Sequence, residues 1–183
     1  MTATEHVILV DEYDNPVGTA EKMEAHRHNL RHRAFSVFIF RKTPPNACLT
    51  APVELLLQQR AAHKYHSPNL WTNTCCSHPR PGEDIIHAGE RRLQEEMGLQ
   101  LPLSYACQFH YIAHFENGLV ENEIDYILTG WIGRHTIRPA PEEVQAYRWV
   151  TGDQLKQELS LYPTHFTPWL PLALHHLEAK CRF

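Results

Sequence analysis

Two short segments of the chain place chemically versatile side chains two positions apart. Cys76 and His78 form the first pair, and Glu121 and Glu123, on either side of Asn122, form the second. In an extended strand, side chains two positions apart project from the same face. The first pair would set a thiol beside a metal ligand or a base, although a buried cysteine next to a surface histidine is the commoner outcome of such a pattern.

The two glutamates carry like charges on what would be one strand face, while Asn122 points away. Carboxylates that close repel each other unless a cation or a proton lies between them. The pair therefore predicts metal ligation, acid–base chemistry or both. For an isolated pair of this kind, a solvated strand face is the usual explanation.

Histidines supply further candidate ligands. The chain has 14 of them, and His26 and His32 are spaced so that no single strand or straight helix presents both inward. His28 lies between them, and any one of the three could be an ordinary surface residue. Together with His78 and the two glutamates, His26 and His32 form a mixed nitrogen and oxygen set. Such a set suits manganese, iron, zinc or magnesium better than a thiolate-rich structural site.

A charged helix is predicted over residues 84–97, because its apolar residues recur with a helical period and Gly98 supplies the usual stop. The helix carries two arginine–glutamate pairs four positions apart, Arg91 with Glu95 and Arg92 with Glu96. Such pairs are either surface ion pairs worth a few tenths of a kcal/mol each, or a row of carboxylates that holds magnesium while the arginines receive a phosphate.

The elements that must position these residues can be predicted only coarsely. Residues 21–33 begin as a short helix, 71–79 are extended, and 43–52 form an exposed loop. Strands joined by one strongly marked helix predict a mixed α/β or α+β sandwich. The predicted strands are 7–10, 35–41, 54–60, 107–115, 121–131 and 147–150, with an Asn-Gly hairpin turn at 116–118 and further helices at 151–159 and 168–180.

Length and composition narrow the class of protein. A chain of 183 residues with 43% hydrophobic and 21% charged residues is ordinary for a globular domain. The net charge of −4 gives no electrostatic reason to expect binding to nucleic acid or to an anionic membrane. Five cysteines without an even framework, and no signal-like N-terminus, predict reduced thiols and a cytoplasmic protein.

The segment from Ser77 to Leu99 resembles the Nudix box, written G-x5-E-x7-R-E-U-x-E-E-x-G-U. The matching residues are Glu83, Arg91, Leu93, Glu95, Glu96, Gly98 and Leu99. Ser77 stands where glycine is expected, and Arg92 stands where a Nudix hydrolase has a metal-binding glutamate. A guanidinium in that place removes a metal ligand and adds a phosphate clamp, which counts against diphosphate hydrolysis.

Nearly the whole chain is similar to the type I isopentenyl diphosphate isomerases, a branch of the Nudix superfamily. The motifs that carry this resemblance are Glu21-Lys22, His32-Arg33-Ala34-Phe35-Ser36, Trp71-Thr72-Asn73, Cys76-Ser77-His78-Pro79, Glu121-Asn122-Glu123 and Pro168-Trp169. The resemblance implies an α/β/α sandwich around a mixed sheet, with the box helix near 84–97. It also implies one domain over 1–183, with an N-terminal extension at 1–33 that carries metal ligands and a C-terminal helix at 164–183 that closes the site.

The resemblance also implies roles for individual residues. Cys76, Glu123 and Tyr111 match catalytic residues, and Trp169 matches the aromatic residue that faces the hydrocarbon end of the substrate. One divalent cation (Mn²⁺, Mg²⁺ or Zn²⁺) would be held by His26, His32, His78, Glu121 and Glu123, and a Mg²⁺ that arrives with the diphosphate would be held by Glu96. The diphosphate would be bound by Lys22, Arg60, Lys64 and Arg92.

Two details accompany this assignment. The spacing from His26 to His32 is one residue shorter than the resemblance leads us to expect, and His28 is the less favoured substitute ligand. Cys75 would be an ordinary neighbour of Cys76 that points to the opposite face.

The implied reaction moves the double bond of isopentenyl diphosphate to give dimethylallyl diphosphate, through protonation at C4, a tertiary cation and loss of a proton from C2. Glu123, acting through Tyr111, is assigned to deliver the proton and Cys76 to remove one, with the reverse assignment open. The alternatives are a Nudix pyrophosphohydrolase of a nucleotide-type diphosphate and a non-catalytic metal-binding protein. The expected partner is the small-molecule substrate, and the protein would be a monomer or a homodimer.

Overall fold

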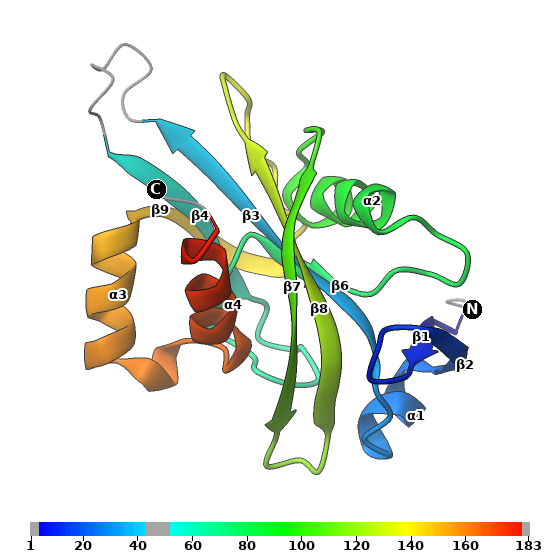
Figure 1. The fold of residues 1–183 in the computed structure, drawn as a ribbon. Coiled ribbons are helices and arrows are strands. Elements are labelled where there is room, and N and C mark those ends of the chain that lie inside the picture. Colours follow the sequence, from blue (N-terminus) through cyan, green and yellow to red (C-terminus); the bar gives the residue numbers. More distant parts are fainter. Residues whose placement is uncertain (1–3, 43–51, 181–183) are drawn as a thin grey trace.

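The computed structural model describes residues 4–42 and 52–180. Apart from Pro52, the loop predicted at 43–52 lies outside the described residues. Figure 1 shows a strongly twisted sheet with helices on both of its faces. None of the described helices is long and apolar enough to cross a membrane.

The described elements follow the order β1 (His6–Val10), β2 (Pro16–Glu21), α1 (Lys22–Arg27), β3 (His32–Lys42), β4 (Val53–Arg60), β5 (Trp71–Thr72), β6 (Cys75–Ser77), α2 (Ile85–Met97), β7 (Ser104–His114), β8 (Val120–Trp131), β9 (Val144–Thr151), α3 (Gly152–Leu161), the 3-10 helix η1 (Pro163–His165) and α4 (Trp169–Glu178).

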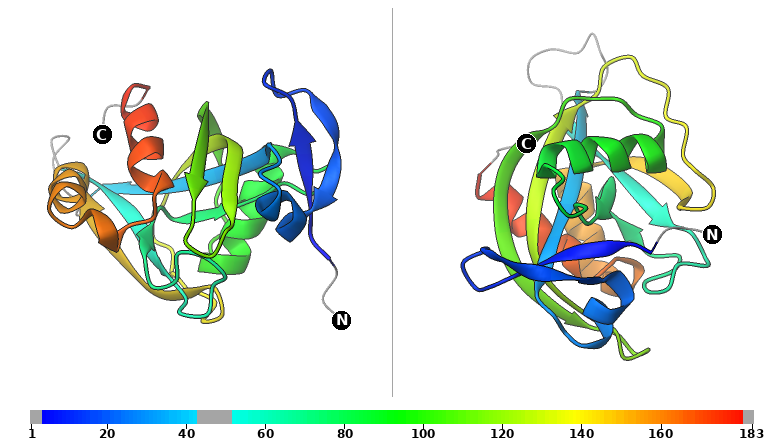
Figure 2. Two further views of the ribbon diagram at one scale, coloured as in Figure 1. Left: turned by 90° about the horizontal axis from the view of Figure 1, so that it is seen from below. Right: turned by 90° about the vertical axis from the view of Figure 1, so that its right-hand side faces the viewer.

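Strand β3 is the centre of the sheet, and its partners make the sheet a mixed one. It pairs in parallel with β8 and antiparallel with β1, β4 and β6. Strand β7 extends the sheet beyond β8, and β5 and β9 both pair with β4. The hairpin of β1 and β2, together with α1, lies at the opposite end of the sheet from α3 and α4 (Figure 2).

Alternate residues of β3 build two separate cores. Phe35, Val37 and Ile39 pack in one buried cluster with residues of α2. Phe38 and Phe40 pack in the other, with residues of α3 and α4. Since successive side chains of a strand point to opposite faces, one strand can hold both helical layers. The predicted α/β/α sandwich with a mixed sheet is confirmed.

The box helix is confirmed as α2, and its two ends show why it forms there. The Asp84 side chain accepts hydrogen bonds from the backbone N–H groups of Ile86 and His87, as an N-cap does. Gly98 ends the helix at a φ of 66°, where glycine is favoured. A β-carbon at Gly98 would also lie 2.7 Å from the carbonyl oxygen of Arg138, so the position has no room for a side chain.

The predicted hairpin of β7 and β8 is confirmed, whereas β2 is an element that the sequence reading did not include. Four of the six β2 residues are exposed and show no apolar alternation. The strand exists because β1 pairs with it, from His6 opposite Glu21 to Val10 opposite Pro16. The stretch predicted as extended at 71–79 forms two short strands, β5 and β6.

The turn of the β1–β2 hairpin is fastened to the sheet through Asp14. This residue has a positive φ of 67°. Its carboxylate accepts a hydrogen bond of 2.7 Å from Nε of Arg33 and another from the hydroxyl of Tyr126, and its carbonyl oxygen accepts one of 2.6 Å from Arg33. The hairpin leads directly into α1, so this contact helps to place the side chains that α1 carries.

Candidate active site

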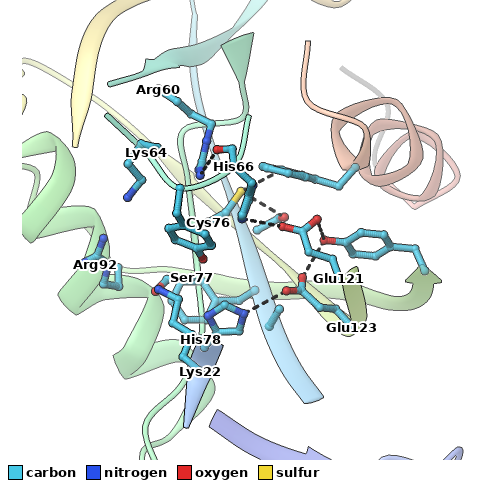
Figure 3. A pocket seen from close by; sticks show the side chains of 16 residues that line it. Lys22, Arg60, Lys64, His66, Cys76, Ser77, His78, Arg92, Glu121 and Glu123 are labelled. Atoms are coloured by element: carbon cyan, nitrogen blue, oxygen red, sulfur yellow. Dashed lines mark hydrogen bonds and ion pairs between the residues drawn. The ribbon is translucent and has the colours of Figure 1, made fainter. Parts of the chain in front are cut away.

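A pocket opens where β3, β6 and β8 meet the loop between β4 and β5 (Figure 3). Its lining includes most of the residues predicted from the sequence: Lys22, Arg60, Lys64, Cys76, His78, Arg92, Tyr111, Glu121, Glu123 and Trp169. These residues come from α1, the β4 strand and the loop after it, β6 and the residue that follows it, α2, β7, β8 and α4. The fold thus brings together groups that lie far apart in the sequence.

At the base of this site, three histidines surround one carboxylate. Candidate ligand atoms of His26, His32, His78 and Glu123 all lie within 4.8 Å of one another. Oε1 of Glu123 is 3.0 Å from Nε2 of His78, 3.3 Å from Nε2 of His32 and 3.9 Å from Nε2 of His26. The register of β3 and β8 explains the closeness of His32 to Glu123, because it sets the two residues directly opposite each other.

Two of these imidazoles are oriented as metal ligands commonly are. Nδ1 of His26 lies 2.7 Å from the carbonyl oxygen of Lys22, and Nδ1 of His32 lies 2.7 Å from that of Leu30. A carbonyl can only accept, so each Nδ1 carries the hydrogen and each Nε2 keeps a lone pair. Nε2 of His26 is buried and has no hydrogen-bond partner. The donor set therefore fits a divalent cation.

The electrostatics of the cluster agree with this fit. Burial lowers the pKa of His78 to about 3 and also lowers the pKa of His26, so both rings are neutral at physiological pH. Burial opposes ionisation of Glu123, but the His32 and His78 rings beside its carboxylate hold its pKa well below the usual range. Neutral imidazoles around an ionised carboxylate are the forms in which these groups bind metals.

Glu121 lies beside this cluster and is connected to it by Tyr111. The Tyr111 hydroxyl lies 2.7 Å from Oε2 of Glu123 and 3.1 Å from Oε2 of Glu121. The β7–β8 register places Tyr111 directly opposite Glu123, which explains the contact. Asn122 points to the other face, where it hydrogen-bonds to His110 and to the Asn29 carbonyl. The two glutamates therefore share one face, as the sequence pattern predicts.

Cys76 faces the same pocket from β6. Its Sγ lies 3.0 Å from Oδ1 of Asn73 and accepts a hydrogen bond of 3.2 Å from Nε1 of Trp169. Burial raises the pKa of Cys76 to about 12. Cys75 points the opposite way, into the fully buried cluster that packs against α2, as predicted.

Four basic side chains form a wall of the pocket, and three of them contact carboxylates. Lys22 Nζ lies 2.8 Å from Glu5, Lys64 Nζ lies 2.6 Å from Glu143, and Arg92 pairs with Glu95, Glu96 and Glu143. The guanidinium of Arg60 instead lies over the ring of Trp169, 5.5 Å from its centroid. A wall of this charge suits an anionic ligand such as a diphosphate.

Glu96 lies apart from the histidine cluster. Its carboxylate is buried and accepts hydrogen bonds from Arg92 and from Nε2 of Gln58. It belongs to neither of the groups of potential metal ligands found among the described residues. The structure therefore groups four of the six predicted ligands around Glu123, places Glu121 near His26 in a second group, and sets Glu96 beside a basic residue of the pocket wall.

Sequence reasoning missed two buried residues of this site. His66 forms a second group of potential ligands with His26 and Glu121, and no periodic pattern in its loop singles it out. Asp125 accepts a hydrogen bond of 2.7 Å from Ser36, whose Oγ lies 3.6 Å from Sγ of Cys76. Continuing the alternation from Glu121 and Glu123 by two residues would have indicated Asp125.

Comparisons with known proteins show the family to which the chain belongs. The NUDIX domain family matches residues 30–170. An isopentenyl-diphosphate Delta-isomerase of Photobacterium profundum is 44% identical over 179 residues, which cover 97% of this chain and 96% of the relative. The isopentenyl-diphosphate Delta-isomerase 2 of Aromatoleum aromaticum is 42% identical over 180 residues, covering 97% and 88%. The chain belongs to the Nudix isopentenyl-diphosphate Delta-isomerase family.

Solved structures with low sequence identity support the fold of this family member. DR0079 from Deinococcus radiodurans superimposes with a TM-score of 0.72 at 15% identity, covering 93% of this chain and 98% of that one. The MutT protein from Methanosarcina mazei gives a TM-score of 0.61 at 14% identity, covering 81% and 94%. At these identities the likeness extends to the fold alone.

Proposed function

We propose that the protein interconverts isopentenyl diphosphate and dimethylallyl diphosphate. The observation that carries this proposal is the placing of Cys76 and the Tyr111–Glu123 pair in one pocket, on different strands, beside a basic wall. The reaction needs two groups that exchange protons with neighbouring carbons and a third feature that holds the diphosphate. The similarity to isomerases over nearly the whole chain supports the same conclusion.

The chemistry explains why both groups are needed. An unactivated alkene is a weak base, so a positioned acid must protonate C4, which creates a tertiary cation at C3. A base then takes a proton from C2, and the double bond forms between C2 and C3. The substrate gains one proton and loses one, and the diphosphate stays intact. Positioned groups of this kind typically contribute 10²–10⁴-fold each.

Glu123, through the hydroxyl of Tyr111, is assigned to protonate C4, and Cys76 to accept the proton from C2. Tyr111 suits the first role because its hydroxyl hydrogen-bonds to Glu123 within the pocket. Because burial raises the pKa of Cys76 to about 12, the sulfur is protonated at neutral pH. Since Glu123 is ionised, these protonation states support the reverse assignment, in which the thiol donates to C4 and the Glu123 carboxylate accepts from C2.

His26, His32, His78, Glu121 and Glu123 are the residues that would hold a divalent cation, whether Mn²⁺, Mg²⁺ or Zn²⁺. When bound, such an ion supplies positive charge that sets the protonation of the neighbouring carboxylates. We assign a Mg²⁺ that accompanies the diphosphate to Glu96. Its contact with Arg92, a residue of the basic wall, supports that assignment.

The remaining pocket residues are assigned to bind the substrate and to orient it. Lys22, Arg60, Lys64 and Arg92 would neutralise the diphosphate and fix the position of the short hydrocarbon tail. Trp169 presents an aromatic ring beside Cys76, where a carbocation would be stabilised by about 2 kcal/mol in a desolvated site. Two described cysteines, Cys75 and Cys76, are free thiols. This fits a reducing compartment and supports placing the reaction in the cytoplasm.

The test is incubation of metal-stripped protein, reloaded with Mn²⁺ and Mg²⁺, with isopentenyl diphosphate. An allylic diphosphate ionises readily in acid whereas the homoallylic substrate does not, so acid-labile product reports isomerisation. We expect metal-dependent conversion without release of phosphate. Release of inorganic phosphate would instead indicate a pyrophosphohydrolase, and bound metal without any turnover would indicate a non-catalytic metal-binding protein.

A further inference from the structure

His66 is a buried imidazole at the pocket to which the proposed function gives no role. It lies in the loop between β4 and β5, and only 4% of its side chain is exposed. Its Nε2 is 3.2 Å from Oε1 of Glu121, which is within hydrogen-bonding distance. Figure 3 shows the ring beside Glu121, on the side away from His78.

Three aromatic rings hold the His66 side chain in this place. It stacks on Phe115 with 4.7 Å between ring centroids. It meets Tyr65 and Trp169 edge to face, at 4.5 Å and 5.7 Å. A ring packed on several sides has little rotameric freedom, so the Nε2 atom is held beside Glu121 before any ligand arrives.

The surroundings of Nδ1 distinguish His66 from the proposed ligands His26 and His32. In those two residues a carbonyl oxygen accepts from Nδ1 and leaves Nε2 as a lone pair. Nδ1 of His66 instead lies 3.4 Å from Oγ of Ser67, and a hydroxyl can donate as well as accept. His66 can therefore carry its hydrogen on Nε2, the atom that lies next to Glu121.

His66 also lies further out than the other histidines. Its ring centroid is 6.3 Å from that of His26, whereas His26–His32 and His32–His78 are each 4.9 Å apart. Like Glu121, it is absent from the four-residue group around Glu123, and both share a second group of potential ligands with His26. Its greater distance from His26 and its contact with Glu121 place His66 at the outer side of the site.

We propose that His66 is a positioning residue for the metal site, whose Nε2–H donates a hydrogen bond to Oε1 of Glu121. With Tyr111 at Oε2, both oxygens of Glu121 would then be oriented by the protein. This inference rests on the proposed metal site and extends it. Outer hydrogen-bond partners of metal ligands typically change affinity by about 10–100-fold when removed.

The test compares two variants of the full-length protein, His66→Phe and His66→Gln, by titration with Mn²⁺ in the absence of substrate. His66→Phe keeps an aromatic ring but loses the N–H, whereas His66→Gln loses the ring but offers an amide N–H. We expect Mn²⁺ affinity to fall about 10–100-fold in His66→Phe and to stay close to that of the unaltered protein in His66→Gln. Equal affinity of His66→Phe and the unaltered protein would overturn the proposal.

A second measurement separates positioning from direct ligation. Pulsed EPR of the Mn²⁺-saturated proteins reports the histidine nitrogens bound to the ion, with His26→Gln as the control that removes one. We expect the same nitrogen couplings in His66→Phe as in the unaltered protein. Loss of one coupling would make His66 a ligand and overturn the positioning role.

The two measurements also separate this inference from the proposed function. Neither uses isopentenyl diphosphate, so a protein that binds Mn²⁺ but does not isomerise still tests His66. If the unaltered protein binds no Mn²⁺, both the metal site and the role of His66 fall together. If it binds Mn²⁺ and His66→Phe binds equally well, only the role of His66 falls.

Discussion

At the scale of single residues, neighbouring cysteines offer a matched pair of variants. Cys76 faces the pocket from β6, and Cys75 is buried on the other side of the same strand, against α2. The two thiols differ in what they contact, but both can be shortened to alanine. A comparison of the two variants therefore separates a role in the reaction from a role in packing.

We expect Cys76→Ala to lower turnover of isopentenyl diphosphate by about 10²–10⁴-fold, because it removes one of the two proton-exchanging groups. Cys75→Ala should retain turnover close to that of the unaltered protein. It should instead lower the free energy of unfolding by about 1 kcal/mol, since it removes buried packing atoms. Turnover and chemical denaturation of both variants check this. Near-normal activity in Cys76→Ala would contradict its assignment.

Prediction of single residues from the sequence succeeded where the spacing along a strand determines which side chains share a face. Strand alternation indicates that Glu121 and Glu123 share a face, and the structure bears this out. No local rule indicates that His66 reaches Glu121, because the contact depends on how the β4–β5 loop folds over β8. Long-range contacts of loop residues are set by tertiary packing, which short-range patterns do not encode.

At the scale of elements, the same distinction explains which strands could be predicted. Strand β3 is rich in aromatic and β-branched residues, so its sequence indicates a buried strand. Strand β2 has a mostly exposed face and includes Pro16 and Gly18, which the sequence rules associate with turns. Its conformation follows from pairing with β1, a contact that its own composition does not reveal.

The β1–β2 hairpin has a consequence for the site, because it leads into α1 with Lys22 and His26. Asp14→Ala removes the side-chain contacts with Arg33 and Tyr126, although the backbone carbonyl can still accept from Arg33, and it places alanine at a positive φ that costs about 1–2 kcal/mol. We expect a free energy of unfolding lowered by about 2–4 kcal/mol, the sum of that cost and the lost hydrogen bonds. We also expect weaker Mn²⁺ binding, since the placing of His26 depends on this turn.

The control for this prediction is Asp14→Asn, which tolerates the positive φ and keeps an oxygen acceptor. Its loss of stability should be clearly smaller than that of Asp14→Ala. Thermal unfolding and Mn²⁺ titration measure the two effects separately. An Asp14→Ala variant with unaltered stability would show that the contacts at Asp14 do not anchor the hairpin.

At the scale of the whole molecule, the candidate metal site joins two parts of the chain. The NUDIX match covers residues 30–170, so Lys22 and His26 precede it, whereas His32, His78, Glu121 and Glu123 lie within it. The strand pattern predicts the fold of the matched region only coarsely, and the α/β/α sandwich was implied by the family resemblance. The way the preceding segment returns to complete the site was indicated only by the family resemblance, since the spacing of the histidines does not specify a common centre.

A cation bound at this site should therefore stabilise the whole protein. Binding to the folded state alone at 100 times the dissociation constant contributes about 2.7 kcal/mol. For a chain of this size, each kcal/mol raises the melting temperature by about 2–4 °C, so we expect Mn²⁺ to raise it by about 5–10 °C and a chelator to reverse the change. In His26→Ala, which lacks the ligand from the preceding segment, most of the increase in melting temperature should vanish.

Limited proteolysis adds a local readout: Mn²⁺ should slow cleavage between residues 6 and 31 in the unaltered protein but not in His26→Ala. An equal increase in melting temperature for both proteins would mean that the cation binds without joining the two parts of the chain.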